Sequence, residues 1–166
     1  MTRLLLIVLF LFALGWHEPV LAQLPVQWHG TWSGMMQIYR QKNFVDSVAV
    51  RLTIAPTSKP GVLTWKTEYL SAKLPMVKDY TLKIKDPEKG IYLTDEGEGT
   101  QLVNYLVGNK LYNVFSVEGI LLTASYELRN DELIFEVTSG KQLPDAPNSV
   151  SSYAIDNLQR VVLRRM

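Results

Sequence analysis

The sequence contains no cysteine among its 166 residues. A disulfide framework, a thiol nucleophile and a thiolate metal site are therefore all excluded. The same absence excludes a bacterial lipoprotein, whose lipid is attached to a cysteine at the cleavage site. Beyond residue 22 the chain also lacks an Asn-x-Ser/Thr glycosylation sequon. For an exported chain, both absences favour a bacterial periplasm over eukaryotic secretion.

Histidine is almost as scarce, because only His29 remains beyond residue 22. A histidine-based catalytic triad would have to form around this single position. No cluster of histidines and carboxylates has the spacing of a metal site, and a haem iron would need a methionine or tyrosine as its axial ligand. We therefore expect no enzymatic activity, no metal and no other cofactor. An enzyme would need two converging ionisable groups inside the fold, and the sequence indicates no such pair.

Neither sign of charge predominates. The net charge is +1, with 17 basic and 16 acidic residues. This balance gives no indication of binding to nucleic acid or to an anionic membrane surface. The one acidic cluster, residues 95–99, is too short for a calcium-binding loop and lacks its later bidentate glutamate. We expect it to be a solvated hairpin turn.

A long apolar run occurs only near the N-terminus. Arg3 precedes the apolar stretch Leu4–Leu14, and Val20-Leu21-Ala22 has the small-residue character that a signal peptidase requires. The run is shorter than the ~20 residues of a membrane-spanning helix. We predict that residues 1–22 are a secretory signal peptide and that residues 23–166 form one domain. The mature protein is expected in the bacterial periplasm, without an integral membrane segment.

The rest of the chain is a series of short strand-like segments. β-Branched and aromatic residues alternate with polar ones between turn residues that recur about every ten positions. No stretch beyond residue 22 shows a helical period over three turns. The expected strands are 30–40, 46–55, 61–70, 77–85, 90–95, 101–107, 110–117, 119–128, 132–139 and 155–165. This pattern predicts an all-β fold, a single antiparallel up-and-down barrel of about 8–10 strands.

Alternation also indicates which side chains point into the barrel, because successive residues of a strand face opposite sides of a sheet. Four of the expected strands have one apolar and one polar face. Their expected interior residues are Val48, Val50, Leu52, Ile54, Leu63, Trp65, Tyr69, Tyr80, Leu82, Ile84, Leu133, Phe135 and Val137. The segments 101–107 and 110–117 are apolar on both faces, so the pattern assigns no interior face to them.

The first expected strand opens with Gly30-Thr31-Trp32 and continues to Gly34. This element resembles the Gly-x-Trp motif of the calycins, the superfamily of the lipocalins and the fatty-acid-binding proteins. Its extended form also resembles the opening of the nitrobindins. Ten strands fit the fatty-acid-binding-protein branch best, and the short loop after the first strand has no room for the helical lid of that branch. The resemblance therefore implies a divergent bacterial calycin.

The resemblance also implies how such a barrel is closed. The tryptophan of the motif covers the bottom of the barrel, and a basic residue of the last strand packs across its ring. The candidates for that basic residue are Arg160, Arg164 and Arg165. We predict that Gly30, Trp32, Arg160 and Arg164 are the barrel-closing residues.

Five aromatic residues on apolar strand faces are the candidate ligand-binding residues: Trp65, Tyr69, Tyr80, Tyr126 and Phe135. Their rings are suited to the apolar part of a ligand, and the tyrosine hydroxyls are suited to its polar head. Arg40 and Arg51 are the candidate partners of a ligand carboxylate, although alternation turns Arg51 outward. The same rings are also suited to plugging the barrel.

Two functional hypotheses follow from these alternatives. In the first, the protein is an exported lipocalin-like barrel that binds a small apolar or amphipathic molecule without catalysis. In the second, a filled barrel acts as a protein-interaction module in the bacterial cell envelope. The long loop 141–152 and the doubly apolar segments 101–107 and 110–117 favour the second hypothesis, and the sequence does not decide between the two.

Overall fold

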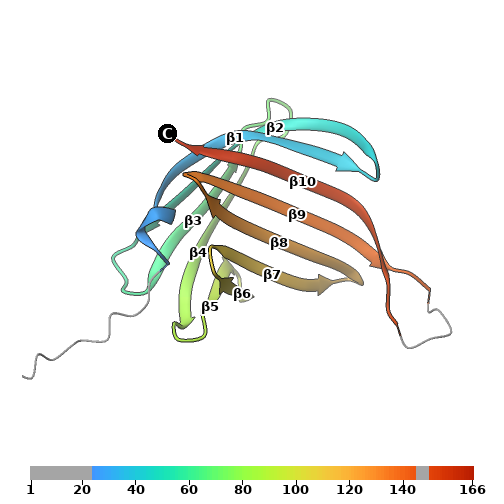
Figure 1. Cartoon of the computed structure of the whole chain (residues 1–166). Coiled ribbons are helices and arrows are strands. Elements are labelled where there is room, and N and C mark those ends of the chain that lie inside the picture. Colours follow the sequence, from blue (N-terminus) through green and yellow to red (C-terminus); the bar gives the residue numbers. More distant parts are fainter. Residues whose placement is uncertain (1–23, 145–149) are drawn as a thin grey trace, which may run out of the picture.

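The computed structural model describes residues 24–144 and 150–166, so the predicted signal peptide 1–22 lies outside the described residues. One short 3-10 helix, η1 (Val26–Trp28), precedes ten strands (Figure 1). The strands are β1 (Gly30–Arg40), β2 (Asn43–Pro56), β3 (Val62–Tyr69), β4 (Met76–Asp86), β5 (Ile91–Gly97), β6 (Thr100–Val107), β7 (Lys110–Val117), β8 (Ile120–Arg129), β9 (Glu132–Gln142) and β10 (Tyr153–Arg165).

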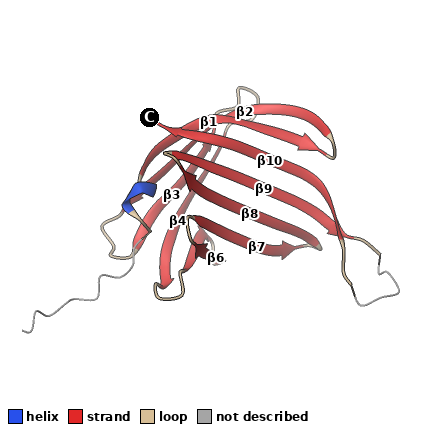
Figure 2. Cartoon of the chain, viewed as in Figure 1, coloured by secondary structure: helices blue, strands red, loops and turns tan. Residues whose placement is uncertain are grey.

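The ten strands form a closed antiparallel up-and-down barrel, which confirms the fold predicted from the sequence. Each strand pairs with its neighbours in the chain, and β10 returns to pair with β1. The observed strand ends differ from the expected ones by at most three residues. Figure 2 shows that strands make up most of the described chain. In the described part of the chain, no helix has the length and apolar character needed to cross a membrane.

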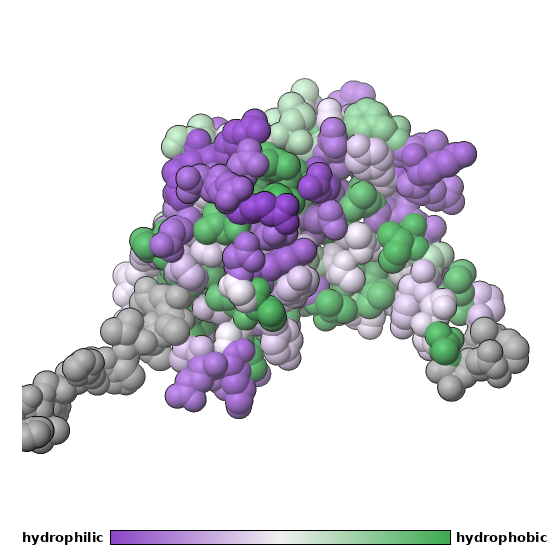
Figure 3. Space-filling view, viewed as in Figure 1, coloured by the Kyte–Doolittle hydropathy of each residue, from purple (hydrophilic) through white to green (hydrophobic). Residues whose placement is uncertain are grey.

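Side chains alternate between the barrel interior and its outer surface as predicted. On β2 the residues Val50, Leu52 and Ile54 are buried, and Leu133 and Phe135 are buried on β9. On the outer surface, ion pairs join neighbouring strands. In Figure 3 hydrophilic residues cover much of the wall formed by β1, β9 and β10.

The pairing of β6 with β7 shows which residues of these two strands, left unassigned by the sequence pattern, face the interior. Asn104 of β6 lies opposite Asn113 of β7, and both side chains are buried in the interior. Interior positions on these strands are therefore 102, 104 and 106, and 111, 113 and 115. The outward positions carry the exposed side chains of Val103, Tyr105, Val107, Tyr112 and Val114.

One end of the barrel is closed by two tryptophans and an arginine. Trp28 and Trp32 are buried, and the Trp32 indole Nε1 donates a hydrogen bond to the Trp28 carbonyl oxygen at 2.9 Å. The guanidinium of Arg165 lies 4.2 Å from the centre of the Trp32 ring. It also donates hydrogen bonds to the carbonyl oxygens of Gln27, at 2.7 Å, and His29. These contacts connect β10 to residues 27–29, the segment that precedes β1.

The structure assigns the closing cation to Arg165, which corrects the prediction of Arg160 and Arg164. Val161 and Leu163 point inward on β10, so strand alternation turns residue 165 to the same side and residues 160 and 164 outward. Arg160 instead pairs with Glu136 at 3.4 Å, and Arg164 pairs with Glu132 at 2.9 Å.

Gly30 and Gly34 allow the close packing of this end. Gly30 has a φ of +139°, and a Cβ at this position would clash with the Arg165 guanidinium. A Cβ on Gly34 would clash with the carbonyl oxygen of Val162 on β10. The first glycine therefore permits the cation to reach Trp32, and the second permits β10 to approach β1.

Replacing the closing cation is expected to destabilise the fold. Arg165→Gln removes a cation–π contact and charge-assisted hydrogen bonds to two carbonyls, so we expect a loss of about 1–2 kcal/mol in the free energy of unfolding. The matched variant Arg164→Gln removes an exposed ion pair and is expected to cost less than about 0.5 kcal/mol. Urea unfolding followed by tryptophan fluorescence measures both. Equal losses in the two variants would contradict the assignment of Arg165.

His29 makes the stability of this end depend on pH. Burial lowers the pKa of His29 below its ordinary value of 6.5, and its Nε2 has no hydrogen-bond partner among the described residues. Because the unfolded chain binds the proton more readily, stability is fully present above about pH 6.5 and falls as the pH decreases below it. Urea midpoints between about pH 7.5 and 5.5 are expected to fall in the wild type and to fall less in His29→Gln. An identical decline in both proteins would rule out this role.

Candidate ligand-binding site

The barrel interior contains a cavity of about 250 Å³. Its walls are formed by strands β3 through β10, whereas β1 and β2 contribute buried residues such as Met36 and Val50 to the core. The cavity lies between a layer of aromatic rings and the end of the barrel opposite Trp32. The lining residues are Trp65, Thr67, Tyr69, Lys78, Tyr80, Thr94, Glu96, Leu102, Asn104, Asn113, Phe115, Leu122, Ala124, Tyr126, Phe135, Val137, Ser139 and Gln159.

Three aromatic rings form the deep side of the cavity. Trp65 and Tyr126 meet edge to face with their ring centres 4.9 Å apart, and Tyr126 stacks on Phe135 at 4.2 Å. Burial raises the pKa of Tyr126, so its hydroxyl stays protonated. The rings come from β3, β8 and β9, where alternation brings all three to the same interior layer. Their edges and faces offer an apolar surface to anything in the cavity.

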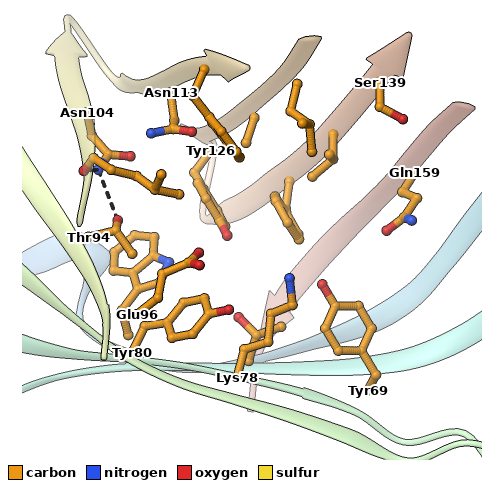
Figure 4. A pocket seen from close by; sticks show the side chains of 18 residues that line it. Tyr69, Lys78, Tyr80, Thr94, Glu96, Asn104, Asn113, Tyr126, Ser139 and Gln159 are labelled. Atoms are coloured by element: carbon orange, nitrogen blue, oxygen red, sulfur yellow. Dashed lines mark hydrogen bonds between the residues drawn. The ribbon is translucent and has the colours of Figure 1, made fainter. Parts of the chain in front are cut away.

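The opposite side of the cavity is polar. Figure 4 shows the Lys78 amine and the hydroxyl groups of Tyr69 and Tyr80 directed into the same space, with the Glu96 carboxylate beside Tyr80. Burial raises the pKa of Tyr69 to about 12. Burial, followed by the negative charge of Glu96, also raises the pKa of Tyr80. Both phenols are therefore neutral hydrogen-bond donors at ordinary pH.

Lys78 is the cation of the cavity. Its ammonium lies 5.9 Å from the centre of the Tyr80 ring. Among the described residues it forms no ion pair, whereas Lys66 and Lys83, on the outside of β3 and β4, each do. An inward lysine without a carboxylate partner is available to an anionic group of a ligand.

Two asparagines form a polar wall on β6 and β7. The Asn104 side-chain Nδ2 donates to Thr94 Oγ1 at 2.9 Å and to the Leu102 carbonyl oxygen at 3.0 Å. The Asn113 Nδ2 donates to the Val103 carbonyl oxygen at 2.8 Å. The two residues are only 3% and 6% exposed, and these hydrogen bonds hold their side-chain amides in place on the interior face.

All five aromatic residues predicted from the sequence line this cavity, and their contact with a ligand remains a prediction. Trp65, Tyr126 and Phe135 pack against one another, as rings that fill a barrel would. A cavity remains beside them, as expected of rings that line a ligand pocket. The predicted carboxylate partners do not line the cavity. Arg51 faces outward and pairs with Glu68 at 3.7 Å, and Arg40 is exposed at the end of β1.

Besides the tyrosines, the cavity has polar lining residues that were not predicted: Lys78, Glu96, Asn104 and Asn113. Lys78 and Tyr80 lie two positions apart on β4, so the alternation that assigned Tyr80 to the interior could also have found Lys78. Asn104 and Asn113 had no comparable signal, because their strands are apolar on both faces. The turn between β5 and β6 is confined to residues 98–99, because residues 95–97, expected in a solvated turn, belong to β5, and Glu96 lines the cavity. Among the described residues, no three histidine, aspartate or glutamate side chains are placed to hold a metal ion.

Comparison with known proteins shows the fold. No protein-family model and no curated protein matches the sequence. A protein of unknown function of the DUF3598 family from Nostoc punctiforme is similar in structure, with a TM-score of 0.61 and 16% identity over 87% of this chain. The chain spans 50% of that protein's length.

Two further solved structures match over nearly their whole length. Rv2717c from M. tuberculosis gives a TM-score of 0.52 at 14% identity, with 87% of this chain and 99% of that protein covered. A mutant of the fluorescent protein UnaG gives a TM-score of 0.51 at 17% identity, with 86% of this chain and 98% of that protein covered.

Lys78 is expected to anchor an anionic probe in the cavity. Anilinonaphthalene sulfonate combines a sulfonate with aromatic rings, and its fluorescence rises on transfer to an apolar site. Replacing the charge in Lys78→Met is expected to weaken its binding at least tenfold, since a charge-assisted hydrogen bond contributes about 1.5–3 kcal/mol. Lys85→Met, on the outer face of the same strand, is the control and should bind like the wild type. Unchanged binding by Lys78→Met would contradict the assigned role.

The protein is thus a closed ten-stranded antiparallel up-and-down barrel, similar in fold to Rv2717c and UnaG.

Proposed function

We propose that this barrel binds a small amphipathic molecule and performs no chemistry on it. The observation that carries the proposal is the division of the cavity into an aromatic side, Trp65 and Tyr126, and a polar side, Tyr69 and Lys78. A ligand with an apolar body and a polar end complements both sides. The cavity volume of about 250 Å³ is just below the range of roughly 300–1,000 Å³ for pockets that hold drug-sized ligands, which favours a small one.

The chemistry of the lining favours binding over catalysis. Among the described residues that line the cavity, Glu96 is the only carboxylate, and none is a histidine or cysteine. A nucleophile-and-base pair built on histidine or cysteine therefore has no members among these residues. The tyrosines are held neutral by their raised pKa values, as suits hydrogen-bond donors.

Filling the cavity is the direct test of the proposal. Ala124 lines the cavity on β8, so Ala124→Phe places a ring where the ligand would lie. We expect at least a tenfold loss of affinity for anilinonaphthalene sulfonate, with unfolding still cooperative. Ser125→Phe adds the same ring to the outer face of β8 and should leave binding unchanged. Equal affinities in the two variants would place the probe outside the cavity and oppose the proposal.

We also propose that the protein is exported to a bacterial periplasm, as the pattern of residues 1–22 suggests. Expression of the whole chain in a bacterium is expected to yield a periplasmic protein whose N-terminus is Gln23. Osmotic-shock fractionation followed by intact-mass measurement determines both the location and the cleavage site. A cytoplasmic protein that retains residues 1–22 would contradict export.

The outer face of β6 and β7 favours a second function, contact with a protein of the cell envelope. Val103, Tyr105, Val107, Tyr112 and Val114 are all exposed there, and Tyr105 lies opposite Tyr112. Contiguous exposed apolar side chains are typical of interaction sites. A photo-crosslinking residue at position 112 should capture one envelope protein in the native host, and recovery of only the uncrosslinked protein would count against this function.

A further inference from the structure

The two asparagines of the cavity wall have a fixed orientation. Asn104 and Asn113 occupy directly opposed positions on β6 and β7. The side-chain nitrogen of Asn104 faces the carbonyl oxygen of Leu102, and that of Asn113 faces the carbonyl oxygen of Val103. A carbonyl oxygen can only accept a hydrogen bond, so each side chain must present its NH₂ group there and not its own oxygen.

This orientation turns both amide oxygens toward the cavity. Figure 4 shows the Asn104 and Asn113 oxygens on the cavity side of their side chains, while the Asn104 nitrogen is bonded to Thr94. Within the described residues, neither oxygen accepts a hydrogen bond. Both residues also line the cavity, so the oxygens are within reach of its contents.

Two adjacent acceptors in a largely buried wall restrict what can fill the cavity. A hydrocarbon chain against Asn104 and Asn113 would remove water from both oxygens and offer no donor in return, which is costly for buried polar groups. A ligand edge that carries N–H or O–H groups would satisfy them. The Glu96 carboxylate, on the neighbouring strand β5, is a further acceptor on the same cavity lining.

The other walls favour a flat ligand with an acidic end. Trp65 and Tyr126 offer ring surfaces on the deep side of the cavity, and aromatic rings pair favourably by stacking or edge-to-face contact. Lys78 and Tyr69 supply donors at the polar side, where the cation has no ion-pair partner among the described residues. The asparagine oxygens, on β6 and β7, and the donors Tyr69 and Lys78, on β3 and β4, thus occupy different parts of the lining, and Glu96 lies beside Tyr80.

We propose that the ligand is a small planar ring compound with N–H or O–H donors along one edge and an acidic group at the other end. Asn104 and Asn113 accept hydrogen bonds from the donor edge, and Lys78 binds the acid. An unbranched fatty acid is excluded as the preferred ligand, because its chain leaves both amide oxygens unsatisfied. This inference rests on the proposed binding function and narrows it to one ligand class.

The test compares small carboxylic acids with and without a hydrogen-bond donor on the ring. Indoleacetate carries one ring N–H, its N-methyl derivative lacks it, and a carbon-methylated isomer keeps it at the same size. Isothermal titration of the wild-type protein is expected to give at least tenfold weaker binding for the N-methyl derivative than for the carbon-methylated isomer. Decanoate, an unbranched acid, is expected to bind at least tenfold more weakly than indoleacetate.

Variants of the wall provide the complementary measurement. Leucine is close to asparagine in size and has no acceptor, so Asn104→Leu and Asn113→Leu are each expected to reduce the preference for the N–H compounds and to improve decanoate binding. The comparison of ligands on the wild type needs no variant, so a misfolded variant does not affect the test.

The outcomes separate this inference from the proposed function. Equal binding of the two methylated acids, or tighter binding of decanoate, would overturn the donor-edge inference while leaving a ligand-binding barrel. No binding by any of the acids, or by anilinonaphthalene sulfonate, would overturn the proposed function and this inference with it.

Discussion

Closure of the barrel through Trp32 and Arg165 is the interaction on which the rest of the structure depends. It joins the last strand to the segment before the first, and the Arg165 hydrogen bond to Gln27 spans 138 residues of sequence. Pairing of β1 with β10 leaves no unpaired strand edge, which removes the usual route to edge-to-edge association. The same contacts form a solid floor, so the interior is packed at one end and hollow toward the other.

The interior therefore has two parts with different chemistry. Near the floor, Trp28, Trp32 and Leu52 are almost completely buried and form an apolar core. Beyond the layer of Trp65, Tyr126 and Phe135, the inward positions are occupied by a lysine, a glutamate and two asparagines as well as apolar residues. Polar groups at interior positions stabilise a fold poorly unless something satisfies them. Their presence beside a cavity is more readily explained by ligand recognition than by folding.

Strand positions and most interior faces were predictable because they follow from a period of two residues. The same period explains the error about Arg160 and Arg164, since the basic residue that reaches Trp32 must share the side of Val161 and Leu163. Lys78 was also within reach of this reasoning. A lysine on an otherwise apolar strand face departs from the apolar pattern by which interior positions are recognised.

Other features could not be derived from the sequence. The inward faces of β6 and β7 depend on which residues pair across the strands, because apolar residues occupy both faces of each. The free oxygens of Asn104 and Asn113 depend on the positions of the neighbouring backbone carbonyls. The balance between a packed and a hollow interior depends on how the rings of ten strands fit together, and strand periodicity carries no information on that fit.

Native mass spectrometry of the protein purified from its own host tests the central claim most directly. A denatured sample gives the mass of the bare chain for comparison. A ligand-binding barrel predicts a native mass that exceeds the denatured mass by one small molecule, released on unfolding. A native mass equal to that of the bare chain, from cells in which the ligand is available, would contradict the account.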